Sequence, residues 1–310
     1  MFDNMVMAIS HFIREIGRGK EGARHLSRSQ AHELMAQVLD GAVSDLALGA
    51  FCVAMRIKGE TPEEMAGFLD ATHERLQRIP NPSSKPVVVL PSYNGSRRLP
   101  LLTPLLALLL AREGWSVLIH GGNTEDQRLA TSDVMQALGL SVLATPRALA
   151  HAEVAFAPTA LLCPGLWRLL EVRRSVGLRN PGHSLVKLMN PIDGPSLRVA
   201  SYTHPEYAVS MQDTLTLLKA HAMLLRGTEG EPVADYRRAP QMRCLLGGQP
   251  VPAAQAEATM PEQTPLPTGL DARASAALIE DMLQGRLPLP LPVQMQVTQL
   301  CAMAQQLSAS

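Results

Sequence analysis

One stretch constrains the fold of this chain more than any other. Residues 86–139 alternate twice between a short apolar run and a segment with helical apolar spacing. The first run, 87–90, is β-branched and stops at Pro91, and the second, 115–119, ends at His120 and Gly121. Repeats of this kind build a parallel sheet, and ligands bind where the carboxyl ends of such strands meet. We therefore expect any site to lie between residues 91–98 and 120–127.

The chain before this stretch has the pattern of an all-helical unit. Capping-box sequences begin at Ser27 and Thr61, the second with Pro62 at the first helical position. Strand–helix alternation starts only at residue 86, and a hairpin is expected from 233–237 and 241–245. The sequence predicts an α/β fold in two parts. They are a small helical domain (1–84, joined by helices of about 164–191) and a larger α/β domain with a mostly parallel sheet (85–163 and 192–310).

Composition narrows the classes of function. The 310 residues carry no net charge, so any nucleic-acid site must be a local patch. The four cysteines are scattered without a C-x-x-C pair, which favours reduced thiols, no metal site and a cytoplasmic location. The longest apolar run, 99–111, is too short to cross a bilayer, so no membrane association is expected.

The loop after the first strand is a poor phosphate cradle. Such a cradle needs successive glycines before a helix N-terminus, and this loop offers only Gly95, with Pro91 and Tyr93 beside it. Turn chemistry explains the small polar residues of the loop as well as ligand binding does. A lone histidine at a strand end is likewise more often structural than catalytic. The candidates for a small anion or ligand are Ser92, Asn94, Gly95, Thr103 and His120, together with the more distant Arg179.

Two clusters of basic residues are candidates for phosphate contacts. The segment 164–191 has five bases against one acid, Glu171, and the N-terminal cluster is diluted by Glu15 and Glu21. Either cluster is also explained by a solvated helix face or internal salt bridges. Affinity for nucleic acid grows with the number of phosphates neutralised, so a dimer that joined both clusters would bind more tightly. The candidates are Arg168, Arg173, Arg174, Arg179 and Lys187, with Arg14, Arg18 and Lys20.

Residues 26–66 resemble the N-terminal helices of anthranilate phosphoribosyltransferase, a glycosyltransferase family 3 fold. The resemblance rests on the Leu-Asp-Gly turn at 39–41 and on Met-Arg-x-Lys-Gly-Glu-Thr-x-Glu-Glu at 55–64. It continues through 114–139, 164–191 and 227–230. The resemblance implies a small helical domain, a large α/β domain and a substrate cleft between them. It also implies a homodimer formed through the helical domain.

The family's catalytic signatures are missing. Its Gly-Thr-Gly-Gly-Asp phosphate loop corresponds here to residues 91–95, and its Asn-x-Ser-Thr helix start leaves one hydroxyl, Thr103. The Asp-Glu pair that binds magnesium in the family falls on Pro232 and Val233, which supply no carboxylate. The pattern is similar to a divergent, YbiB-like branch that shares Pro-Ser-Tyr-Asn-Gly and Gly-Thr-Glu-Gly-Glu. Non-specific nucleic-acid binding by a homodimer is attributed to that branch.

Three hypotheses follow from the residues and the resemblance. The leading one is a catalytically degenerate homodimer, without a cofactor, that binds DNA or RNA non-specifically through phosphate contacts. The alternative is an active pentosyl- or phosphoribosyltransferase that uses phosphoribosyl pyrophosphate and magnesium, with Arg179 holding a small acidic aromatic acceptor. The third is a scaffold or regulatory dimer. Enzymatic activity is left open, with the missing signatures favouring its loss.

Overall fold

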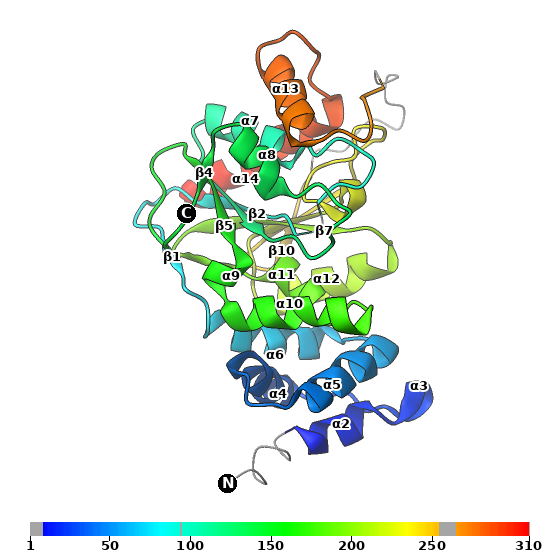
Figure 1. The fold of residues 1–310 in the computed structure, drawn as a ribbon. Coiled ribbons are helices and arrows are strands. Elements are labelled where there is room, and N and C mark those ends of the chain that lie inside the picture. Colours follow the sequence, from blue (N-terminus) through cyan, green and yellow to red (C-terminus); the bar gives the residue numbers. More distant parts are fainter. Residues whose placement is uncertain (1–8, 94, 254–264, 310) are drawn as a thin grey trace. The chain divides into compact units, whose positions relative to one another are not determined.

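The computed structural model describes residues 9–93, 95–253 and 265–309, with the backbone alone for Lys20. The chain divides into two compact units, one of Met1–Gln77 and Thr159–Pro191 and one of Arg78–Pro158 and Ile192–Ser310 (Figure 1). The sequence placed these boundaries at 84 and about 164. The difference arises because β1 (Ile79–Pro80) pairs with β6 (Ile192–Asp193) in the second unit, while α9 (Thr159–Leu162) packs against the helix that follows it.

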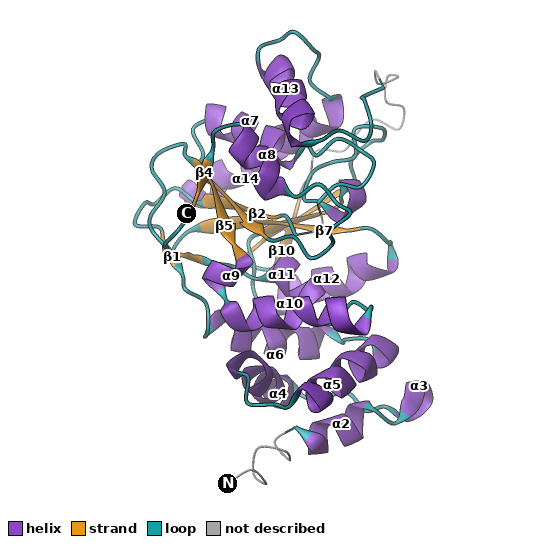
Figure 2. Cartoon of the chain, in the orientation of Figure 1, coloured by secondary structure: helices purple, strands orange, loops and turns teal. Residues whose placement is uncertain are grey.

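The first unit is all helical. Helix α4 packs against both α6 and α10, α11 packs against α6, and the two N-terminal helices α2 and α3 pack against α5 (Figure 2). Besides α9, its helices are α2 (Ser10–Ile16), α3 (Gly19–Gly22), α4 (Arg28–Asp40), α5 (Asp45–Lys58), α6 (Pro62–His73), α10 (Pro164–Val176) and α11 (Gly182–Leu188). Both capping boxes form as predicted. Ser27 Oγ accepts from the Gln30 N–H at the start of α4, and Thr61 Oγ1 accepts from the Glu64 N–H at the start of α6.

A buried ion pair joins the end of α5 to the start of α6. Lys58 Nζ donates to a Glu64 carboxylate oxygen at 2.6 Å, and the two side chains are 2% and 0% exposed. The same carboxylate accepts from the backbone N–H of Leu26 at 2.8 Å and of Thr61 at 3.0 Å. Burial of a carboxylate is tolerated because several donors meet it.

The second unit is built on an eight-stranded sheet of described residues, in the order β10-β9-β8-β7-β2-β3-β5-β4. Strand β9 is antiparallel to both of its neighbours, and the remaining pairs are parallel. The strands are β2 (Val87–Pro91), β3 (Val117–Gly121), β4 (Ser141–Val142), β5 (Val154–Pro158), β7 (Ser196–Tyr202), β8 (Ala222–Arg226), β9 (Met242–Leu246) and β10 (Gln249–Val251). The predicted fold class, helical part plus mostly parallel sheet, is confirmed.

Helices cover both faces of this sheet (Figure 2). Four of them, α7 (Thr103–Arg112), α8 (Thr131–Ala137), α13 (Ala272–Leu283) and α14 (Leu291–Ser308), cover one face. Their apolar side chains share a core with Val88, Leu90, Val117 and Ile119 of the central strands. Helix α12 (Glu206–Leu217) packs against β8 from the opposite face. Over the described ranges, no helix combines the length and apolar character needed to cross a bilayer.

Strand β2 lies where the strand order reverses, with β3 and β5 on one side and β7 and β8 on the other. In sheets of this type, ligands bind outside the carboxyl ends of the two strands at such a reversal, which are β2 and β7 here. The predicted hairpin of 233–237 and 241–245 is wrong. Strand β9 pairs with β8 and β10, and residues 233–237 form no strand but belong to the loop that follows β8.

Candidate functional site

The loop after β2 is fastened to the loop after β3. Ser96 and Leu129 exchange two backbone hydrogen bonds, at 2.9 and 2.8 Å. Gly95 precedes this bridge with φ of +63°, and a Cβ added there would lie 2.3 Å from the Leu129 carbonyl oxygen. Only glycine fits both the left-handed backbone and the close approach. The loop is therefore held in one shape by its neighbour.

The carboxylate of Glu231 lies inside this loop. It accepts hydrogen bonds from Ser92 Oγ, from the Gly95 N–H at 2.8 Å and from Thr103 Oγ1 at 2.9 Å. Thr103 is the first residue of α7, where the helix dipole favours negative charge. Glu231 is 1% exposed, and Ser92 and Thr103 are 3% and 0% exposed. Three of the predicted anion-binding residues thus surround one anion, which belongs to the chain itself.

Glu229 holds the outer part of the same loop. Its carboxylate accepts from the backbone N–H groups of Arg97 at 2.7 Å and Arg98 at 3.3 Å, and from Ser96 Oγ at 3.2 Å. Glu229 has a left-handed backbone, with φ of +52°, which costs a non-glycine residue about 1–2 kcal/mol. Two carboxylates from the loop after β8 therefore meet backbone donors of the loop after β2.

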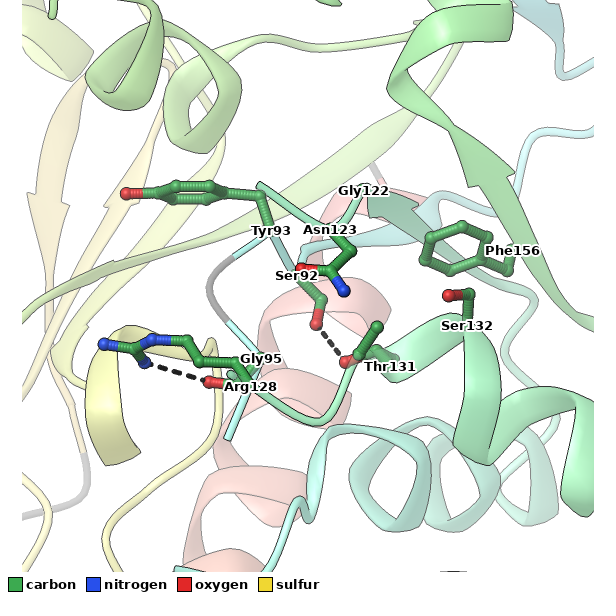
Figure 3. Close-up of a pocket in the computed structure, with 10 residues that line it drawn as sticks. Ser92, Tyr93, Gly95, Gly122, Asn123, Arg128, Thr131, Ser132 and Phe156 are labelled. Atoms are coloured by element: carbon green, nitrogen blue, oxygen red, sulfur yellow. Dashed lines mark hydrogen bonds between the residues drawn. The ribbon is translucent and has the colours of Figure 1, made fainter. Parts of the chain in front are cut away.

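A small depression lies beside this arrangement (Figure 3). Its polar lining comes from Ser92 of the loop after β2, Asn123 and Arg128 of the loop after β3, and Thr131 and Ser132 of α8. Ser92 Oγ contacts Thr131 Oγ1, and Arg128 Nη1 donates to the backbone carbonyl of the neighbouring Gly95 at 3.3 Å. The hydroxyls of Ser92 and Thr131 are buried against each other, so the depression has no room for a ligand in this structure.

His120 is in β3, paired in register with Pro91 of β2 and Ala157 of β5. It is completely buried, and burial lowers its pKa to about 3, so the imidazole is neutral at physiological pH. Neither ring nitrogen has a hydrogen-bond partner among the described residues. A neutral imidazole contributes no charge to anion binding.

Sequence reasoning missed Glu229 and Glu231. The available signal was the Gly-Thr-Glu-Gly-Glu run, in which two acids fall within a few residues of the positions expected to bind magnesium. The site does not fit magnesium, because Pro232 and Val233 carry no oxygen ligand in their side chains and the Glu231 carboxylate is already met by three donors. No group of three metal-binding side chains occurs in the described part of the chain.

The arginine candidates of α10 lie in the helical unit. Arg168 Nη2 donates to the Leu39 carbonyl at 2.7 Å, which ties α10 to the end of α4. Arg174 forms a 3.0 Å ion pair with Glu171 and remains 40% exposed. Arg173 and Arg179 are half-buried.

The remaining basic candidates differ in exposure. Lys187 is buried in α11, 8% exposed, which does not favour contact with an external phosphate. Arg14 is exposed, and Arg18 forms a 3.1 Å pair with Glu15. The side chain of Lys20 and the whole of Asn94 lie outside the described residues.

Comparisons with known proteins place the chain in a family. Residues 10–75 match the helical bundle domain of the glycosyl transferase family. The chain is 27% identical to anthranilate phosphoribosyltransferase of Anaeromyxobacter dehalogenans over 90% of its own length and 83% of the relative's. It is 36% identical to the uncharacterized protein YbiB of Escherichia coli K12 over 92% of its own length and 91% of that protein's. The chain belongs to the anthranilate phosphoribosyltransferase family, in its YbiB-like branch.

The fold of the anthranilate phosphoribosyltransferase family extends over nearly the whole chain. The crystal structure of the Thermus thermophilus enzyme superposes with a TM-score of 0.75 at 22% identity, covering 98% of this chain and 94% of the enzyme. These matches confirm the resemblance and the expected fold, a helical part joined to an α/β part with a mostly parallel sheet.

Proposed function

We propose that this chain is a catalytically inactive member of its family that binds nucleic acid without sequence preference, as a homodimer. The observation that carries the proposal is the composition of α10, which places Arg168, Arg173 and Arg174 on one helix with Glu171 as its single acid. Arginine forms paired hydrogen bonds with phosphate oxygens, and such contacts carry no base specificity.

The ion pairs of the exposed arginines do not oppose phosphate binding. Arg174 is paired with Glu171, and Arg18 with Glu15, at 40% and 46% exposure of the arginine side chains. Exposed pairs of this kind contribute about 0–1 kcal/mol. A backbone phosphate of nucleic acid carries one negative charge, like a carboxylate, and offers two oxygens to a guanidinium, so it can displace pairs as weak as these.

Loss of catalysis is supported by the loop after β2. The positions expected to hold the metal are Pro232 and Val233, and the loop donors Gly95 N–H and Thr103 Oγ1 are engaged by Glu231. Phosphoribosyl pyrophosphate with magnesium would need the same donors and a free carboxylate. The alternative, an active transferase, predicts that this ligand pair raises the melting temperature, and we expect no rise.

Homodimer formation is supported by an apolar stripe on α5. Leu46, Ala50, Val53 and Ile57 follow helical spacing and are exposed, with 86% exposure at Leu46 and 57% at Ile57. The opposite face of the helix carries Phe51, Cys52 and Met55 and is buried. In a dimer with a two-fold axis the stripes of the two copies face each other, so each stripe is buried by the other.

The test of nucleic-acid binding is a fluorescence-anisotropy titration with a labelled duplex and a labelled single strand at several salt concentrations. We expect log affinity to fall linearly with log salt, with a slope of about −0.9 per phosphate contacted. Replacing Arg173 and Arg174 with alanine should weaken binding about tenfold at low salt and make the slope shallower by about 1–2 per protomer.

The matched control replaces Arg237 and Arg238, an adjacent pair in the other unit with 46% and 44% exposed side chains. It removes the same charge from a different place, so binding should be nearly unchanged. Equal losses in both double variants would assign binding to overall charge rather than to α10. No binding at low salt would overturn the proposal.

A further inference from the structure

Three donors from two separate segments converge on one point at the strand ends. Ser92 Oγ and the Gly95 N–H come from the loop after β2, and Thr103 Oγ1 comes from the first turn of α7. The side chains of Ser92 and Thr103 are nearly inaccessible to water. Donors collected at a strand end and a helix N-terminus are the usual components of an anion site.

The acceptor at this point comes from a third, distant segment. Glu231 belongs to the loop after β8 and is 1% exposed. A buried carboxylate is stable only when donors replace its water, and hydrogen bonds to a charged oxygen are stronger than neutral ones. The helix N-terminus and the three donors supply that replacement for Glu231.

We propose that the loop after β2 and the first turn of α7 form a small-oxyanion site whose resident ligand is the chain's own Glu231 carboxylate. Formate, acetate and inorganic phosphate are the class of ligand that would take its place. Because the carboxylate is tethered to the same chain, its effective concentration is high and external anions do not compete with it. The proposal is independent of nucleic-acid binding, which concerns the helical unit.

The tether itself is fixed by Glu229. Glu229 lies two residues before Glu231 in the chain. Its carboxylate accepts hydrogen bonds from the backbone N–H groups of Arg97 and Arg98. Substitution at Glu231 therefore removes the occupant while the loop that carried it stays attached. The donors remain in place because the Ser96–Leu129 bridge and Gly95 shape their loop independently of Glu231.

The experiment is anion rescue of Glu231→Ala, followed by thermal unfolding of the full chain. The variant removes the acceptor of the Gly95 N–H and of Thr103 Oγ1, while Ser92 Oγ keeps its contact with Thr131 Oγ1, so we expect Tm to fall by at least about 4 °C. Formate, acetate or phosphate at about 100 mM should restore half of the loss or more, whereas chloride at equal ionic strength should not. The wild-type chain should show no anion-specific stabilisation.

Two further variants make the result decisive. Adding Thr103→Val to Glu231→Ala should abolish rescue, because one donor is lost. Glu206→Ala, an exposed acid on α12, should show neither the loss nor the rescue. If Glu231→Ala does not fold, Glu231→Ser, which keeps a small polar side chain, is used instead. Its thermal unfolding is measured with the same anions. Absence of anion-specific rescue in a folded Glu231 variant, or equal rescue by chloride, would overturn the proposal.

Discussion

At the scale of single residues, burial shifts the pKa values of two ionisable side chains within the parallel sheet. Burial lowers the pKa of His120 to about 3 and that of Arg198, in β7, to about 10. Arg198 therefore stays charged at neutral pH, whereas His120 stays neutral far below the pH at which an exposed imidazole is protonated. Residue type alone therefore did not reveal that His120 is uncharged in the folded chain.

The neutral His120 makes stability depend on pH. Below about pH 6.5 this imidazole is protonated in the unfolded chain but stays neutral in the folded chain. The free energy of unfolding therefore decreases as the pH falls from that value toward 3. His120→Leu should flatten the dependence by up to about 1.4 kcal/mol per pH unit in this window. Urea unfolding of both proteins at pH 7, 6 and 5 measures the difference, and identical slopes would contradict it.

At the scale of elements, features set by residues close in sequence could be predicted, whereas contacts between residues far apart in sequence could not. The helix starts at Ser27 and Thr61 were predictable because a capping box is closed within four residues. The hairpin of 233–245 failed because the second run pairs with β8 and not with the first. The partners of Glu231 lie more than a hundred residues earlier in the sequence, so no local pattern announced them.

The contact between the loops after β2 and β3 predicts a difference between two glycines. Gly95 and Gly139 both have a left-handed backbone, but an added Cβ meets the Leu129 carbonyl at 2.3 Å in the first and nothing within 4 Å in the second. Gly139→Ala should cost about 1 kcal/mol, from backbone strain alone. Gly95→Ala should cost about 1–3 kcal/mol more, because the two loops must separate.

Chemical denaturation of the two glycine variants under the same conditions measures this difference directly. Equal losses of unfolding free energy would mean that the loops adjust to the methyl group. In that case the bridge between Ser96 and Leu129 does not constrain the loop that holds Glu231.

At the scale of the whole molecule, the apolar stripe of α5 predicts the assembly state. Light scattering should give the mass of two chains of 33.5 kDa for the wild type and of one chain for Ile57→Glu, since a charge in a symmetric interface faces its own copy. Val209→Glu on α12 is the control, because Val209 is 58% exposed against 57% for Ile57. A wild-type mass of one chain, or an unaltered mass in Ile57→Glu, would exclude this interface.

The two-part architecture was largely predictable, since an all-helical pattern followed by strand–helix alternation is visible without any contact information. The unit boundaries shifted by several residues because they depend on the pairing of β1 with β6, two strands of two residues each. Of the site, Ser92, Gly95 and Thr103 were candidates for binding a small anion or ligand, and in the structure they donate to the Glu231 carboxylate. An external ligand at this position stays a prediction. The identity of the anion between these three residues was not predicted, because no sequence pattern indicates which distant donors a carboxylate will contact.

The helical unit is assembled from two stretches of chain with residues 78–158 between them. Helices α10 and α11, which pack against α4 and α6, emerge from the ribosome only after half of the sheet has been made. A nascent chain therefore carries the apolar surfaces of α4 and α6 uncovered until α10 and α11 have been made, and the helical unit is completed only after residue 191 has been added.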